Sequence, residues 1–95
     1  MEEKEVKVTD QRIFEVEIEE QKKELTARLT KRLAAYRKSL GMTQQDVADL
    51  TGMKRPNIAR VESGRITPTL EVMIKIASSM NLELQIDFVE KVQQV

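Results

Sequence analysis

The chain has 95 residues, of which 40% are apolar and 34% are charged, as expected for one small soluble domain. It contains neither cysteine nor histidine, so it has no disulfide and no ordinary pair of nucleophile and general base, and we expect no enzyme. Its carboxylates form no tight cluster, so no metal or cofactor is expected. It has no apolar run of roughly 20 residues and no secretory signal in MEEKEVKV, so we expect a cytoplasmic protein without a membrane partner.

The net charge is zero, but the charges are segregated along the chain. Residues 1–24 hold nine acidic and five basic side chains, residues 25–67 hold three and nine, and residues 68–95 hold four and two. A basic middle between acidic ends indicates a polyanionic partner for the middle, unless it reflects chance over short windows.

The acidic segment 1–24 has two possible structures. VKV and FEVEIE alternate apolar and polar residues, as a half-buried strand does. Phe14 and Ile18 also begin a helical stripe that continues through later leucines, so residues 5–19 stay open between strand and helix. The segment is a candidate partner-binding region through Phe14, Val16 and Ile18, or else a solvated extension of the helix that follows.

Two helices are predicted before residue 53. The first runs from about residue 21, has good helix formers and basic residues in its last turn, and stops at Gly41. The second begins at Thr43, where Asp46 three residues later suits a capping box. Gly52 ends it in a left-handed conformation, which glycine adopts at little cost.

Two more helices follow. Pro56 fits only the first turn of a third helix, which Gly64 ends. Pro68 breaks the next loop and Thr69 caps the fourth helix. The inner face of that helix is predicted to consist of Leu70, Met73, Ile74 and Ala77.

The hydrophobic period changes after residue 80. In NLELQIDF apolar and polar residues alternate, which predicts a strand with one apolar face. That face would consist of Leu82, Leu84, Ile86 and Phe88. One strand cannot satisfy its own backbone, so it pairs either with the N-terminal segment or with the same strand of a second copy. We expect residues 81–95 to form a dimerisation strand and tail, with packing inside one chain as the alternative.

The stretch from residue 42 to 64 has the spacing of two helices folded over a tight turn. Ala48 is small where the helices cross, and Gly52 makes the corner. The positions that would be half-buried between them are Val47, Thr51, Met53, Ile58 and Val61. These are the steric requirements of a helix-turn-helix.

TQQDVADLTG, IARVESG and TPTLEVMIKIASSM resemble the phage repressor/Cro-type helix-turn-helix family, from about residue 33 to residue 80. Two positions depart from the family pattern. Thr51 replaces a usual aliphatic residue, and Lys54 stands where a Ser or Thr cap is common, which leaves a helix amide without a side-chain acceptor. The resemblance implies a helix-turn-helix DNA-binding domain over residues 25–80, with its third helix in the DNA major groove.

The resemblance also implies which residues contact DNA. Arg55 takes the first groove-facing position, where an arginine pairs with guanine, and Pro56 can make only an apolar contact. The full set of DNA-contact candidates is Thr43, Gln44, Lys54, Arg55, Pro56, Asn57, Arg60 and Arg65, of which Thr43, Gln44, Lys54 and Arg65 are assigned to phosphates.

Each candidate has a structural alternative. Arg60 can pair with Glu62 or Asp49, Gln44 can serve only its own first turn, and Arg55 can be plainly solvated. Glu62 is expected to be structural, bonded to backbone or to an arginine of the first helix. The first-helix cations Arg28, Lys31, Arg32, Arg37 and Lys38 are weaker DNA candidates.

The order of an acidic segment, a DNA-binding domain and an LELQI strand resembles HigA-like antitoxins. That resemblance implies a mostly α, compact helical bundle with a C-terminal strand that pairs in a homodimer on a palindromic operator. It also implies a small basic toxin as partner of the acidic segment, and repression of the chain's own operon. A stand-alone repressor without a toxin is the alternative.

Overall fold

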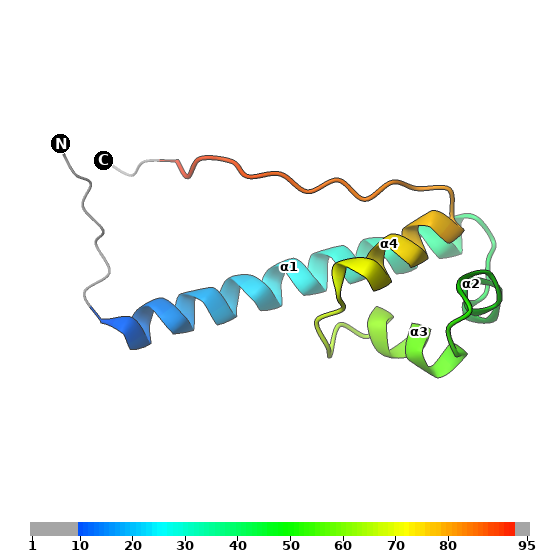
Figure 1. The fold of residues 1–95 in the computed structure, drawn as a ribbon, viewed down its shortest axis with the longest axis horizontal. Helices are drawn as coiled ribbons and strands as arrows, with labels where there is room; N and C mark the ends of the chain where they lie inside the picture. Colours follow the sequence, from blue (N-terminus) through cyan, green and yellow to red (C-terminus); the bar gives the residue numbers. More distant parts are fainter. Residues whose placement is uncertain (1–9, 93–95) are drawn as a thin grey trace.

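The computed structural model describes residues 10–92 as four helices: α1 (Gln11–Ser39), α2 (Gln44–Thr51), α3 (Arg55–Glu62) and α4 (Leu70–Ser79). The three short helices gather against the C-terminal half of α1 and form a head, while the N-terminal half of α1 projects from it (Figure 1). The predicted helical bundle with a helix-turn-helix is confirmed. No described helix is long and apolar enough to cross a membrane.

Helix α1 decides the structure of most of the ambiguous N-terminal segment. Asp10 caps the helix, because its Oδ1 accepts a hydrogen bond from the Arg12 backbone N–H at 2.9 Å. The helix then runs for 29 residues, roughly 43 Å, and passes residue 24 without a break. The strand alternative is therefore wrong for residues 11–19, and residues 5–9 lie outside the described residues.

The turn between α2 and α3 follows the predicted local chemistry. The Thr43 hydroxyl accepts from the Asp46 N–H at 3.0 Å, and the Thr43 N–H donates to Asp46 Oδ2 at 2.8 Å. These two bonds form the expected capping box. Gly52 has φ of 77°, and its N–H donates to the Ala48 carbonyl at 2.9 Å, which ends α2. The chain can then turn sharply into α3.

Helix α3 starts as predicted, with Pro56 in its first turn. Lys54 stands at the N-cap and makes no side-chain capping bond, which confirms the expected departure from the family pattern. On its inner side α3 buries Ile58 and Val61.

The core lies where α2, α3 and α4 meet. Its members are Val47, Ala48, Ile58, Val61, Ile76 and Met80. The predicted inner face of α4 is only half right: Met73 and Ala77 are buried, but Leu70 and Ile74 are about half exposed. The stripe that faces α2 and α3 includes Ile76 and Met80 instead, because packing selects one of two adjacent apolar stripes on this helix.

The C-terminal segment runs back along α1 in an extended conformation (Figure 1). Asn81, with φ of 59°, reverses the chain, and the Leu82 N–H donates to the Ala77 carbonyl at 2.8 Å. Residues 83–92 make no backbone–backbone hydrogen bond within the described part of the chain. The predicted strand is therefore absent from the single chain, because the segment has no backbone partner there. Pairing with residues 11–19 is excluded, since these are helical.

Candidate nucleic-acid interface

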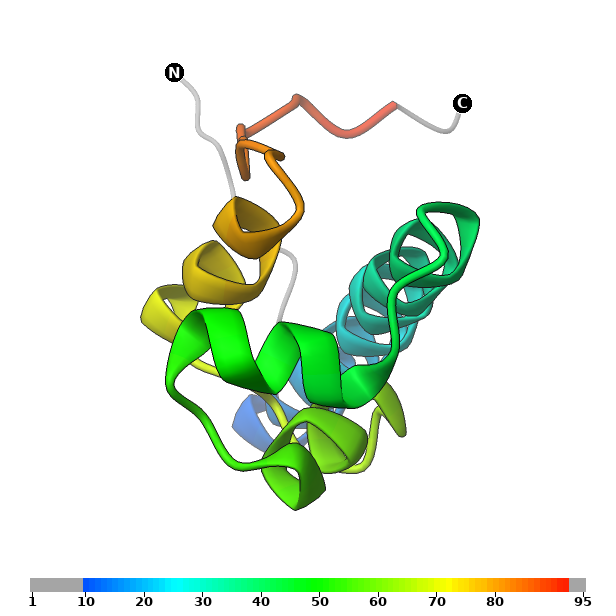
Figure 2. The same cartoon turned by 90° about the vertical axis from the view of Figure 1, so that its right-hand side faces the viewer.

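Helix α3 and the start of α2 carry all the predicted DNA-contact residues except Arg65, which follows α3 after one turn. Thr43 and Lys54 are the N-cap residues of the two helices, and Gln44 and Arg55 are their first residues. Gln44 is half-buried and the others are exposed. Helix α3 lies on the side of the head opposite the C-terminal segment in both views (Figures 1 and 2). Among these candidates the structure brings Arg55 against Gln44 and Arg60 against Asn57.

A buried ion pair holds α3 against α1. Arg37 donates from Nε to Glu62 Oε2 at 2.6 Å and from Nη2 to Glu62 Oε1 at 2.9 Å. A third bond runs from Arg37 Nη1 to the Met42 carbonyl at 2.8 Å. The two side chains are only 10% and 9% exposed. The prediction that Glu62 is structural is confirmed. Arg37 is not available for DNA contact, because its guanidinium is buried in this pair.

The ion pair shifts the pKa of both groups. Burial of Glu62 raises its pKa, but hydrogen bonds from Arg37 and Gln44, with the charges of Arg37 and Lys38, outweigh burial and lower the pKa below its ordinary value. The hydrogen bond to Glu62 raises the pKa of Arg37. Glu62 is thus ionised at neutral pH and keeps its counter-charge.

Gln44 connects the buried pair to the surface. Its Nε2 donates to Glu62 Oε1 at 3.0 Å, and its Oε1 accepts from Arg55 Nη1 at 3.3 Å. The sequence alone did not predict this link, because 18 residues separate Gln44 from Glu62 and no local pattern pairs them. One effect is that the exposed Arg55 guanidinium rests on a side chain that is itself anchored.

The other cations of this surface are not paired with acids in the described residues. Arg60 Nη1 reaches Asn57 Oδ1 at 3.4 Å, and neither Glu62 nor Asp49 binds Arg60. Between residues 54 and 65 the sequence has four cations and one acid, and that acid is taken by Arg37. The surface therefore presents net positive charge with guanidinium and amide groups that can form bidentate hydrogen bonds with base edges.

The helix separates the three residues predicted to bind a partner protein. Phe14 and Ile18 are one turn apart on one face of α1, whereas Val16 lies on the other side, where it shares a shallow hollow with Ile13. All four are largely exposed. No group of three or more potential metal ligands is present among residues 10–92.

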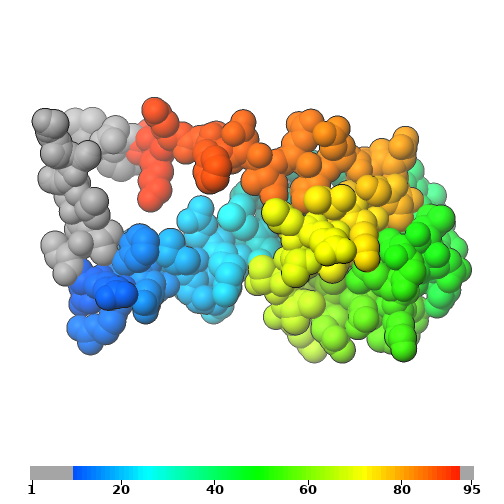
Figure 3. Space-filling view, in the orientation of Figure 1, coloured from blue at the N-terminus to red at the C-terminus, as the bar shows by residue number. Residues whose placement is uncertain are grey.

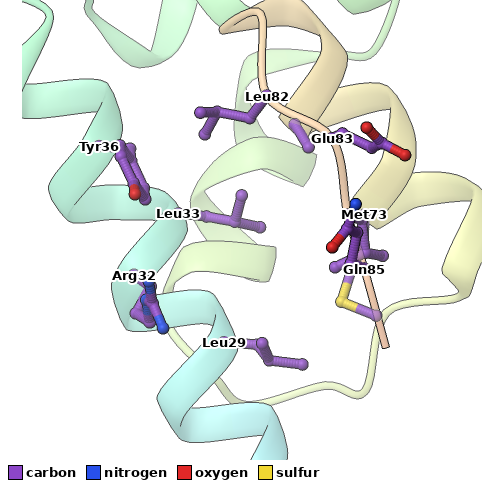
Figure 4. Close-up of a pocket in the computed structure, with 10 residues that line it drawn as sticks. Leu29, Arg32, Leu33, Tyr36, Met73, Leu82, Glu83 and Gln85 are labelled. Carbon is purple, nitrogen blue, oxygen red and sulfur yellow. The ribbon is translucent and has the colours of Figure 1, made fainter. Parts of the chain in front are cut away.

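The four predicted dimerisation residues divide into two pairs. Leu82 and Leu84 are half-buried and line a groove of about 260 Å³ between α1, α4 and the C-terminal segment (Figure 4). Ile86 is 60% exposed and Phe88 is 97% exposed. The apolar face therefore starts on the head and ends without cover.

Comparison with known proteins places this geometry in a family. A family model described as helix-turn-helix matches residues 33–86, more than half of the chain. An uncharacterized HTH-type transcriptional regulator of Haemophilus influenzae is 36% identical over 77 residues, which are 81% of this chain and 78% of that protein.

Two further relatives match shorter stretches. The cryptic phage CTXphi transcriptional repressor RstR of Vibrio cholerae is 38% identical over 60 residues, 63% of this chain and 52% of the repressor. An uncharacterized HTH-type transcriptional regulator of Archaeoglobus fulgidus is 33% identical over 54 residues, 57% of this chain and 77% of that protein. With its capped α2, its glycine corner and its anchored α3, the chain belongs to the Cro/C1-type helix-turn-helix family.

Proposed function

We propose that this chain is a sequence-specific DNA-binding transcriptional regulator whose α3 lies in the major groove. The observation that carries the proposal is the exposed, net positive surface of α3, held in place by the buried Arg37–Glu62 pair behind it. The names of the relatives, which are regulators and a phage repressor, support the same function.

Individual roles follow from side-chain chemistry. Arg55 forms two hydrogen bonds with a guanine, and Pro56 contacts a thymine methyl group. Asn57 and Arg60 reach the neighbouring bases or a phosphate. Gln44 donates its second amide hydrogen to a phosphate, because its first is held by Glu62. Thr43, Lys54 and Arg65 neutralise or bind further phosphates.

The regulator acts as a homodimer on a palindromic operator, because one helix-turn-helix reads only a few base pairs. The proposed contact is antiparallel pairing of the segments that carry Leu82, Leu84, Ile86 and Phe88. It is supported by the lack of backbone–backbone hydrogen bonds at the described residues 83–92 and by the exposure of Phe88.

Binding assays on two DNAs test the DNA-binding role. A cognate duplex, selected from a random pool, is compared with an unrelated duplex of equal length. Arg55→Ala should weaken cognate binding by about 1–3 kcal/mol more than unrelated binding, whereas Lys54→Ala should weaken both equally. Arg12→Ala, the same change on the projecting part of α1, is the matched control and should alter neither.

Two results would contradict this assignment. Equal losses of Arg55→Ala on both duplexes would show that Arg55 contacts only the backbone. Affinity that does not fall as salt rises would indicate a protein-interaction module instead of a DNA-binding protein, because phosphate contacts release counterions.

We further propose that the chain is the antitoxin of a toxin–antitoxin pair and represses its own operon. The support is the N-terminal half of α1, which projects from the head (Figure 3). It is acidic and carries exposed Phe14 and Ile18 on one face. An amphipathic helix of this kind fits an apolar groove rimmed by basic residues, as a small basic toxin would offer. A stand-alone repressor is the second candidate.

Co-expression with the product of the adjacent gene distinguishes the two candidates. If that gene encodes a small basic protein, the pair should co-purify, and Phe14→Asp should weaken the complex much more than Val16→Asp, because Val16 lies on the other face. Equal effects of the two variants would remove the helical face from the proposal. If the neighbouring product does not bind, the stand-alone repressor is favoured.

A further inference from the structure

The groove beside the C-terminal segment lacks an occupant in the single chain. Leu29, Leu33 and Tyr36 of α1 line it, and the side chains of Leu29 and Leu33 extend from α1 toward α4 and the segment (Figure 4). Leu82 and Leu84 of the segment lie along it but are only half-buried, and Tyr36 stays 41% exposed. Arg32, Glu83 and Gln85 also line the groove, but its leucines and Met73 present apolar surface that favours an apolar occupant.

The same chain has apolar side chains without cover. Ile86 and Phe88 continue the face of Leu82 and Leu84, because even-numbered positions of an extended segment point to one side. The chain's own Phe88 does not line the groove and is 97% exposed. Groove and side chains are therefore complementary but do not meet within one copy.

We propose that Ile86 and Phe88 of a second copy occupy this groove, and that the groove is reciprocal: each copy fills that of the other. The inference rests on the proposed dimer and adds to it the surface that the paired segments cover. In antiparallel pairing, directly opposite residues point to the same face. A two-fold axis at residue 85 sets Ile86 of one copy opposite Leu84 of the other and Phe88 opposite Leu82, about 4.8 Å away across the ribbon and above the groove.

This arrangement suits operator binding. The C-terminal segment, which borders the groove, and α3 lie on opposite sides of the head (Figures 1 and 2). A two-fold axis perpendicular to the ribbon therefore keeps both heads on the ribbon's apolar side and leaves both α3 helices facing the same way. Two half-sites on one side of a duplex require that orientation.

The contact area that Phe88 contributes can be compared with that of a stable interface. An aromatic side chain buries about 150–250 Å². Two copies of Phe88, with the paired backbones and the other apolar residues of both segments, supply a substantial part of the roughly 1,200–2,000 Å² of a stable interface. Glu83 and Gln85 also line the groove, so polar groups border this contact.

Dimer dissociation of the full chain, measured by sedimentation, provides the first test. Phe88→Asp should raise the dissociation constant at least about 30-fold, the effect of losing an interface hot spot. Val89→Asp is the matched control, because it adds the same charge at the adjacent position, which is also largely exposed. In an extended segment position 89 lies on the side opposite to position 88, so this variant should change the constant only slightly. Circular dichroism checks that both variants keep the helical head.

Disulfide trapping provides the second test, because the chain has no cysteine of its own. A Phe88→Cys chain mixed with a Tyr36→Cys chain should form a mixed disulfide dimer under mild oxidation. Val89→Cys mixed with the same partner should not.

The outcomes separate this inference from the proposed function. Equal effects of the substitutions at positions 88 and 89, in dissociation or in trapping, would overturn the groove contact while leaving a DNA-binding dimer intact. A wild-type chain that stays monomeric at all concentrations would overturn both the groove contact and the proposed dimer. Loss of operator binding in Arg55→Ala with normal dimerisation concerns only the proposed function.

Discussion

Replacing Glu62 by Gln tests the contact that fixes α3 on α1. The carboxylate accepts hydrogen bonds from Arg37 at 2.6 and 2.9 Å and from Gln44 at 3.0 Å. An amide keeps one acceptor oxygen but puts an NH₂ group where a carboxylate oxygen was. At least one of these bonds is then lost, and the Arg37 guanidinium loses its counter-charge.

The magnitude follows from burial. Removing one partner of a buried ion pair costs about 3–5 kcal/mol, whereas an exposed pair contributes about 0–1 kcal/mol. The two side chains are 10% and 9% exposed, and Arg37 keeps its bond to the Met42 carbonyl. We therefore expect Glu62→Gln to lower the free energy of unfolding by about 2–4 kcal/mol. For a domain of this size the Tm should fall by roughly 10–25 °C.

Urea and thermal unfolding, followed by far-UV circular dichroism at neutral pH and one protein concentration, measure the loss. Glu71→Gln is the matched control, because it breaks the exposed Glu71–Lys75 pair at 3.7 Å and should cost less than about 0.5 kcal/mol. Combining Glu62→Leu with Arg37→Met should restore most of the stability, since no charge stays buried. If Glu62→Gln costs no more than Glu71→Gln, the pair does not anchor α3.

Three further predictions concern the same head. Folding lowers the pKa of Glu62, so its carboxylate contributes fully to the free energy of unfolding above the ordinary pKa of 4.5, and this contribution is lost as the pH falls through the lower folded pKa. When the free energy of unfolding is measured against pH in acid, Glu62→Gln should show a weaker pH dependence than the wild type. Identical profiles would argue against the lowered pKa. Gly52→Ala should lower the free energy of unfolding by about 1–2 kcal/mol through backbone strain alone, because φ is 77° and an added Cβ meets no atom within 4 Å. Gly52→Asn should lower it less, because asparagine adopts the left-handed conformation more readily. The reverse order in the same unfolding assay would contradict this explanation. Lys54→Asn should raise the free energy of unfolding by about 1 kcal/mol, because asparagine supplies the missing N-cap of α3. The same variant should weaken binding to any duplex, because it removes a positive charge. Unchanged DNA affinity would show that Lys54 contacts no phosphate.

Local interactions made much of this protein predictable from its sequence. The capping box of Thr43 and Asp46, the left-handed Gly52 and the place of Pro56 each depend on residues within four positions of one another. The free energy of each of these interactions depends on the backbone conformation of a single turn. The order of the four helices and the exposed cations of α3 follow from the same local patterns.

Tertiary packing decided the remainder. The alternation around Val16 suits a strand, but no described strand offers a backbone partner, so a continuous helix forms and puts Val16 opposite Phe14. On α4 two adjacent stripes are both apolar, and only the positions of α2 and α3 select the one that contains Ile76.

The same holds for the interface itself. That α3 carries arginines is visible in the sequence, but the chain of contacts from Arg37 through Glu62 and Gln44 to Arg55 is not. Such contacts join residues that are far apart along the chain, and their free energy depends on distances and burial that exist only after the helices have packed.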